Sequence, residues 1–169
     1  MDNAPLLAAA REAFKEEPRF VFAEPVIAGG PGGHHGNSLS AREFAAWERG
    51  GRFALTWLNG GTSYGLKREV VSQVNAGSVV IADLLPVSLA EARREFQSRL
   101  AVIAVTAPRQ ARAARLARSL PDRAATQPRR FRRIDFAAMP GLDFIVVDGD
   151  RGLEEALQQF IDAIRLFAR

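Results

Sequence analysis

The chain of 169 residues contains no cysteine and few lysines, and each shortage excludes a kind of site. Without cysteine there is neither a disulfide framework nor a thiolate metal site, and nothing argues for an oxidising compartment. The two lysines are Lys15 and Lys67, and neither follows a glycine-rich loop. A P-loop needs G-x-x-x-x-G-K-[S/T] between a strand and a helix, so that backbone N–H groups cradle phosphates. We therefore expect no triphosphate cradle of that kind from these residues.

Long hydrophobic runs are also missing, since no apolar stretch approaches the ~20 residues of a membrane span. The first residues lack the basic-then-apolar pattern of a signal peptide, so we expect a cytoplasmic location without membrane contact. An apolar content of 47% is enough for one core, which predicts a single domain over residues 1–169. The net charge of +4 conceals a local asymmetry, because residues 109–133 hold nine arginines and a single acid, Asp122. That stretch would attract an anionic partner.

Helical and strand patterns alternate along the chain without internal repeats. Two capping boxes, Ser40 to Glu43 and Ser88 to Glu91, begin two of the helices, and Asn59-Gly60-Gly61 predicts a hairpin turn. The expected strands cover 20–27, 53–58, 63–66, 78–82, 100–105 and 143–148, and the expected helices cover 4–16, 41–48, 68–75, 88–96, one after Pro108, and 153–167. Helices between apolar strands predict an α/β fold with three layers: a mostly parallel sheet, helices on both faces and a small hairpin insertion at one edge.

Several short segments occur in an order and spacing that resemble a known family. They are Thr56-Trp57, Tyr64-Gly65, Val79-Val80-Ile81, Leu89-Ala90-Glu91-Ala92-Arg93, Val105-Thr106-Ala107-Pro108, Ala114-Arg115-Leu116 and Asp148-Gly149-Asp150. Together they resemble the ribose 1,5-bisphosphate phosphokinases, which belong to the guanylate kinase-like group of P-loop kinases and serve phosphonate breakdown. The resemblance implies ATP and Mg²⁺ as cofactors and transfer of a phosphate to ribose 1,5-bisphosphate, which forms phosphoribosyl diphosphate. It also implies a substrate-binding insertion at 28–66 and an arginine-rich lid region at 109–133.

We expect substrate-binding residues on the hairpin and after the central strand. The resemblance implies that the Tyr64 hydroxyl contacts a substrate phosphate while Gly65 lets the backbone turn away; the alternative is a hairpin tyrosine packed on Trp57. Asp83 follows a buried strand, where parallel α/β sheets place ligand and Mg²⁺ groups. The alternative for Asp83 is an aspartate that ends the strand in a turn.

Three arginines recur at steps of three after Pro108, along one side of the expected helix: Arg112, Arg115 and Arg118. The resemblance implies that arginines of this helix clamp the nucleotide phosphates, and Arg115 is the best positional match. A guanidinium group suits that task because it stays charged and bonds two oxygens at once. The alternative is a solvated face paired with nearby acids.

The chain departs from the family pattern at three places that handle phosphate. The strand and P-loop expected before Leu6 are absent, Ala28-Gly29 replaces a Thr-Arg pair, and Ala82-Asp83-Leu84-Leu85 replaces Asn-Gly-Ser-Arg. We therefore expect a phosphosugar kinase relative that binds a phosphorylated sugar or nucleotide, has weak or no kinase activity, and retains no assignable catalytic residue. One alternative is an active family member whose start was misassigned and whose loops drifted, although a trimmed start would explain only the first departure. The other is a non-catalytic binding or assembly protein on a kinase scaffold, whose arginine-rich region contacts an anionic partner.

The absent first strand also bears on partners. In P-loop kinases that strand lies in the middle of the sheet, so without it backbone groups stay unpaired unless a homodimer or a partner chain completes the sheet.

Two other clusters suggest weaker alternatives. The run Arg129-Arg130-Phe131-Arg132-Arg133 invites a nucleic-acid interpretation, but no accompanying binding signature is present, and a surface lid explains the run equally well. His34 and His35 are adjacent and lack a third ligand, so we expect no metal site there.

Asp148-Gly149-Asp150 is expected to end the last strand and to cap the closing helix.

Overall fold

The computed structural model describes residues 4–29, 37–106, 142–149 and 152–169. The chain divides into two compact units. The terminal unit combines residues 1–13 with residues 101–169, and the central unit spans residues 14–100.

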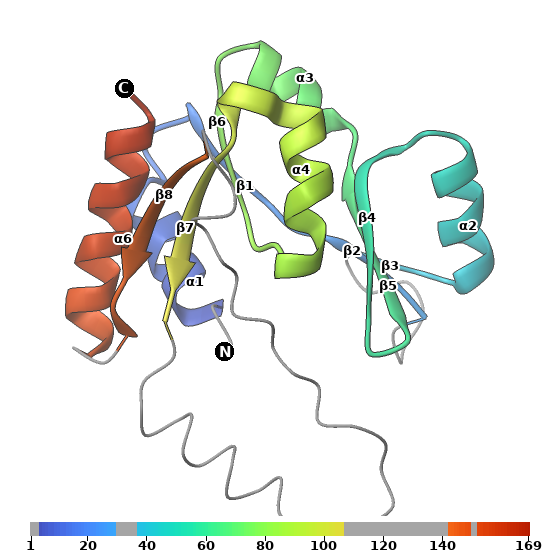
Figure 1. Ribbon diagram of the computed structural model, residues 1–169, viewed down its shortest axis with the longest axis horizontal. Helices are drawn as coiled ribbons and strands as arrows, with labels where there is room; N and C mark the ends of the chain where they lie inside the picture. Colours follow the sequence, from blue (N-terminus) through green and yellow to red (C-terminus); the bar gives the residue numbers. More distant parts are fainter. Residues whose placement is uncertain (1–3, 30–36, 107–141, 150–151) are drawn as a thin grey trace, which may run out of the picture. The chain divides into compact units, whose positions relative to one another are not determined.

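The terminal unit is built around two parallel strands. Strand β7 (Ala101–Val105) pairs with β8 (Asp143–Val147) in one continuous register over the full length of both. The closing helix α6 (Leu153–Phe167) packs on both strands, and α1 (Ala4–Ala13) packs against α6 (Figure 1). The helices meet these neighbours through their apolar stripes, which bury residues such as Ala10 and Phe160.

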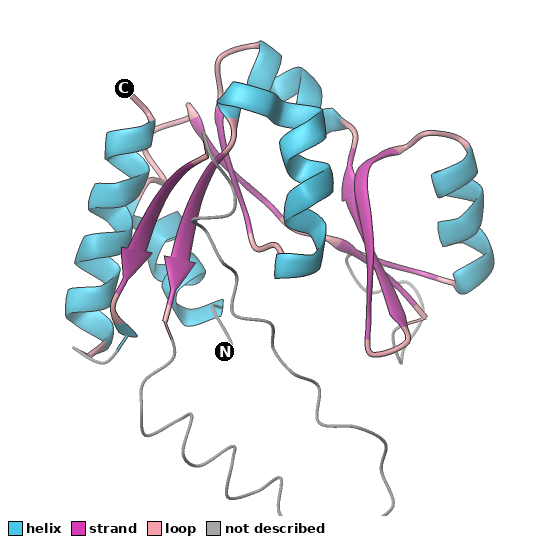
Figure 2. Cartoon of the chain, in the orientation of Figure 1, coloured by secondary structure: helices cyan, strands magenta, loops and turns pink. Residues whose placement is uncertain are grey.

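The central unit contains a parallel strand pair and a separate mixed sheet. Strand β1 (Phe20–Ala23) pairs with β6 (Val79–Ala82). The mixed sheet has the strand order β3-β2-β5-β4, in which β2–β3 is parallel and the other two pairs are antiparallel (Figure 2). Its strands are β2 (Val26–Ala28), β3 (Ser38–Leu39), β4 (Phe53–Asn59) and β5 (Thr62–Lys67).

Three helices accompany these strands: α2 (Ala41–Arg49), α3 (Glu69–Asn75) and α4 (Leu89–Phe96). Short 3-10 turns at Pro86–Ser88 and Gln97–Arg99 flank α4. Helices α2 and α4 lie on opposite sides of the β4–β5 hairpin (Figure 1). The hairpin is therefore covered on both faces.

A β-bulge near the start of β4 directs Phe53 and Leu55 to opposite faces of the sheet. Phe53 is opposite Lys67, yet Leu55 is already opposite Leu66, so Ala54 is the extra residue. Residues two apart in a regular strand share a face, and one inserted residue reverses that relation. Phe53 consequently packs with Phe44 of α2, whereas Leu55 enters the cluster on the other face.

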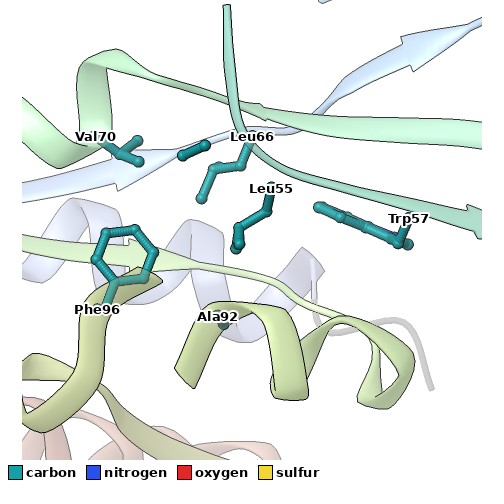
Figure 3. Close-up of a cluster of buried hydrophobic side chains, with 7 residues drawn as sticks. Leu55, Trp57, Leu66, Val70, Ala92 and Phe96 are labelled. Carbon is teal, nitrogen blue, oxygen red and sulfur yellow. The ribbon is translucent and has the colours of Figure 1, made fainter. Parts of the chain in front are cut away.

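The two faces carry two hydrophobic clusters. The larger one, here called the central cluster, comprises Ala54, Leu55, Trp57, Leu66, Val70, Ala92 and Phe96 (Figure 3). The smaller one comprises Val26, Phe44 and Phe53, with Trp47 packed against it.

The α/β prediction is confirmed, and so is the hairpin, but the predicted strand over 20–27 is wrong in one respect. The structure divides it at Glu24 and Pro25 into β1 and β2, which belong to different sheets. Proline has no backbone N–H to donate to a ladder, so the chain changes sheets at that position.

One of the two capping boxes is confirmed. The Glu43 backbone N–H donates to Ser40 Oγ at 3.3 Å, and the Ser40 backbone N–H donates to the Glu43 carboxylate at 2.9 Å. The box at Ser88 is wrong. Ser88 has helical φ and ψ of −87° and −9° at the end of a 3-10 turn, and its hydroxyl donates back to the Leu85 carbonyl at 2.8 Å. A serine that is already helical cannot adopt the extended conformation of an N-cap.

Candidate functional site

The hairpin holds Tyr64 at the middle of the mixed sheet. Tyr64 lies in β5, directly opposite Trp57 on β4 and opposite Ile27 on β2. Its ring stacks on the Trp57 indole with centroids 5.8 Å apart and planes only 8° from parallel. The side chain is half-buried, so one ring face is covered while part of the residue remains accessible. Both interpretations of Tyr64 thus agree with its position, because packing on Trp57 leaves a surface available for a ligand.

Packing within the sheet explains why position 65 is a glycine. It is buried in β5, where it pairs with Thr56 on β4 and Val26 on β2. A Cβ atom at this position would lie 2.6 Å from Cδ1 of Phe53, far closer than atoms pack. The aromatic ring of Phe53 therefore requires glycine here whether or not a ligand binds.

Asp83 follows the last residue of β6 directly, as the sequence predicted, and its side chain is exposed. The next two residues, Leu84 and Leu85, are half-buried and pack against the central cluster. Tyr64 packs against the same cluster. The structure thus brings the hairpin tyrosine and the segment that follows β6 to one hydrophobic cluster, although 19 positions separate Tyr64 from Asp83 in the sequence.

The arginines expected to bind phosphate, Arg112, Arg115 and Arg118, lie outside the described residues, as does the whole region 109–133. His34 and His35 lie outside them too. Within the described ranges, no three side chains of the histidine, cysteine, aspartate or glutamate type gather as a metal-ligand group. Over the same ranges, every helix is too short or too polar to cross a membrane.

The carboxyl ends of β7 and β8 are joined by a polar junction in the terminal unit. The Thr106 backbone N–H donates to the Val147 carbonyl at 3.0 Å, and Thr106 Oγ1 accepts from the Gly149 N–H at 3.2 Å. The Asp148 N–H donates to Gln159 Oε1 of α6 at 3.3 Å. These bonds support the expected strand-ending role of Asp148 and Gly149, whereas Asp150 lies outside the described residues.

Two features escaped sequence reasoning: the contact of Phe53 with Gly65, and the role of Thr106 in closing the strand ends. The pairing of Trp57 with Tyr64 carried a readable signal. Both residues stand equally far from the Gly60-Gly61 turn, and positions equidistant from a two-residue turn face each other across a hairpin. No comparable signal exists for Phe53, because the bulge shifts its register.

Comparison with known proteins defines first the fold class and then the family. Guanylate kinase from Anaplasma phagocytophilum superposes with a TM-score of 0.62 over 94% of this chain and 80% of that chain, at 15% sequence identity. The fold is therefore guanylate kinase-like. No family model matches the sequence.

Curated relatives identify the family. The chain is 31% identical over 159 residues to ribose 1,5-bisphosphate phosphokinase PhnN of Brucella melitensis, covering 92% of this chain and 82% of that protein. It is 32% identical over 149 residues to a bifunctional ribose 1,5-bisphosphokinase-thymidine phosphorylase of Cupriavidus pinatubonensis, and spans 24% of that longer protein. The chain belongs to the ribose 1,5-bisphosphate phosphokinase family.

Proposed function

We propose that this protein retains a binding site for a phosphorylated ribose or nucleotide and that its kinase activity is weak or absent. The proposal rests on one arrangement: Tyr64 and the segment that carries Asp83 flank the same central cluster. Asp83 stands at the carboxyl end of a strand in a parallel pair, which is the usual edge for ligands in α/β proteins. The relatives' substrate, ribose 1,5-bisphosphate, is the first ligand to test.

Two leucines at positions where the family pattern has polar residues support weak catalysis. Leu84 and Leu85 occupy the places where the family pattern has serine and arginine, and both pack against the central cluster. They offer no donor or positive charge to a phosphate. Phosphoryl transfer depends on positioning and on charge stabilisation, so the loss of such groups removes much of the rate enhancement.

The backbone at Gly29 supports the same conclusion. Its φ is +70°, in the left-handed region that side-chain-bearing residues rarely adopt. Ala28 and Gly29 replace a Thr-Arg pair of the family pattern, and an arginine at position 29 would be strained in this conformation. Position 29 therefore offers no guanidinium group to a phosphate.

Any residual phosphoryl transfer would use ATP with Mg²⁺. Mg²⁺ in such sites usually keeps several waters and is bound by one or two carboxylates together with substrate phosphates. A Mg²⁺ ion bound in this way needs no cage of protein ligands, and the exposed Asp83 side chain would supply one carboxylate. It would hold a Mg²⁺ ion that arrives with the phosphates.

The test is calorimetric titration of the 169-residue protein with ribose 1,5-bisphosphate, ATP and GMP, beside a coupled assay of ATP turnover. Binding of ribose 1,5-bisphosphate or GMP with little or no turnover is expected. Fast turnover with ATP would contradict the loss of activity, and absence of binding to all three would contradict the retained site.

A binding or assembly role is the second candidate, and the open edge of β6 favours it. Within the described residues β6 pairs with β1 alone, and its four residues are only half-buried. A strand with one neighbour exposes a row of unpaired N–H and C=O groups to another strand. A second copy of the chain or another protein could supply that strand. Light scattering that shows a monomer at all concentrations would exclude the homodimer.

A further inference from the structure

We infer that Trp57 is a positioning residue whose indole ring sets the orientation of the Tyr64 ring, and hence the location of the Tyr64 hydroxyl in the candidate site. The inference rests on the proposed function, because it assigns the oriented hydroxyl to a phosphorylated ligand. It adds a residue to that site which contacts Tyr64 rather than the ligand.

The backbone of Tyr64 is already held on both sides, by Ile27 on β2 and by Trp57 on β4. What remains free is rotation of the side chain about its two torsions. The Trp57 ring restricts that rotation, because the two rings stack with planes 8° apart and centroids 5.8 Å apart. Offset stacking of this kind is one of the preferred geometries of aromatic pairs. Any other rotamer of Tyr64 gives up the stack.

Trp57 can serve as a fixed surface because it is itself immobilised. Only 7% of its surface is exposed, and it belongs to the central cluster with Leu55 and Leu66. Figure 3 shows the Leu55 and Leu66 side chains directed toward the helix that carries Ala92, with the Trp57 ring beside them. Tyr64, which is half-buried, is the less enclosed member of the pair. The Trp57 ring therefore sets the orientation of the Tyr64 ring, and not the reverse.

The indole N–H identifies which part of Trp57 matters. Nε1 is buried and has no hydrogen-bond partner within the described part of the chain. Buried tryptophan N–H groups usually find a partner, and an unmade bond is unfavourable. The ring face, and not the N–H, is thus the useful part of the residue. Phenylalanine keeps a flat face and lacks the N–H, so it should replace tryptophan better than an aliphatic residue does.

The experiment uses the fact that Tyr64 is the single tyrosine of the chain. Protein grown with 3-fluorotyrosine then gives one ¹⁹F resonance that reports only on this ring. In Trp57→Leu the resonance should move toward that of free fluorotyrosine, and in Trp57→Phe it should stay near the wild-type position. The matched control is Trp47→Leu, which removes the other tryptophan, on the α2 side of the hairpin, and should leave the resonance unchanged. If Trp57→Leu does not fold, Trp57→Met makes the same comparison without a ring, because its unbranched side chain adapts better to the gap that the indole leaves.

Titration of the same proteins with ribose 1,5-bisphosphate tests the consequence. Trp57→Leu should bind about two- to tenfold more weakly, the range expected from loss of one aromatic pair. Trp57→Phe should stay within about twofold of wild type, since it keeps most of the stack. An unmoved resonance in the folded leucine or methionine variant overturns the inference, and so does a moved resonance with wild-type affinity. If the wild-type protein does not bind the sugar, the same titrations are made with GMP. Absence of binding to ribose 1,5-bisphosphate, ATP and GMP overturns the proposed function, while the resonance still decides whether Trp57 orients Tyr64.

Discussion

The ring of Phe53 lies directly over the backbone of Gly65, so that a Cβ atom at position 65 would stand 2.6 Å from Cδ1 of Phe53. The two residues belong to neighbouring strands of the hairpin, and Phe53 is clamped in turn by Phe44 at a centroid distance of 4.6 Å. Because the ring cannot retreat freely, the contact ties the smaller cluster to the strand that carries Tyr64. A change at Gly65 should therefore act first on stability.

Gly65→Ala should lower the free energy of unfolding by about 1–3 kcal/mol, the range for overpacking in a filled interior. Urea denaturation followed by tryptophan fluorescence measures the loss. Phe53→Leu in the same chain makes room for the added methyl group, so the double variant should lose less than the sum of the two single variants. Strict additivity would show that the clash is not the cause.

Leu55→Ala should be far more harmful than Leu58→Ala, although both change the same residue type in the same strand. Leu55 is 1% exposed in the central cluster and Leu58 is 64% exposed. We expect a loss of about 2–5 kcal/mol for Leu55→Ala and within about 0.5 kcal/mol for Leu58→Ala. Thermal and urea unfolding of both variants provide the measurement, and equal losses would contradict the assigned faces of β4.

Thr106→Val should weaken the terminal unit by about 1–3 kcal/mol, because the Gly149 N–H then loses its acceptor at Thr106 Oγ1. Thr106→Ser keeps the hydroxyl and serves as the control, with a smaller loss. The rate of amide hydrogen exchange at Gly149 measures the loss of this hydrogen bond. Faster exchange is expected in the valine variant alone, and unchanged exchange there would argue that the hydroxyl is not the partner of Gly149.

Asp83→Asn should remove the Mg²⁺-dependent part of ribose 1,5-bisphosphate binding, by about 1.4 kcal/mol or more, which is a factor of about ten. The matched control is Asp143→Asn, an exposed carboxylate at the amino end of β8, where a parallel strand presents no ligand edge. Titrations with Mg²⁺ and with EDTA compare the two. A wild-type Mg²⁺ dependence in the Asp83→Asn protein would remove Asp83 from the site.

Local chemistry explains how much of the fold was predictable. The capping box of Ser40 and Glu43 and the Gly60-Gly61 turn were correctly predicted because a few adjacent residues suffice to form them. Ser88 carried the same pattern as Ser40 and failed, since the preceding 3-10 turn had already set its backbone in a helical conformation. Identical short patterns therefore diverge when their neighbours differ.

The candidate site was predictable only in part. Both Tyr64 and Asp83 were predicted from the sequence. The structure packs Tyr64 and the two neighbours of Asp83, Ala82 and Leu84, against the central cluster, and the ligand contacts stay predictions. Sequence alone offered two alternatives for Tyr64, a ligand contact or packing on Trp57. The structure confirms the packing, and the half-buried Tyr64 side chain keeps part of its surface accessible.

By itself, the sequence determined the alternation of helices and strands, the hairpin and the absence of a lysine after any glycine-rich loop, because periodicity, turn residues and composition are local properties. Only the tertiary structure decided that β1 and β2 enter different sheets, that Phe53 and Leu55 face opposite clusters, and that Gly65 sits beneath an aromatic ring. Those relations depend on which segments become neighbours. The neighbours are chosen by the burial of apolar surface across the whole unit, which no short stretch of sequence encodes.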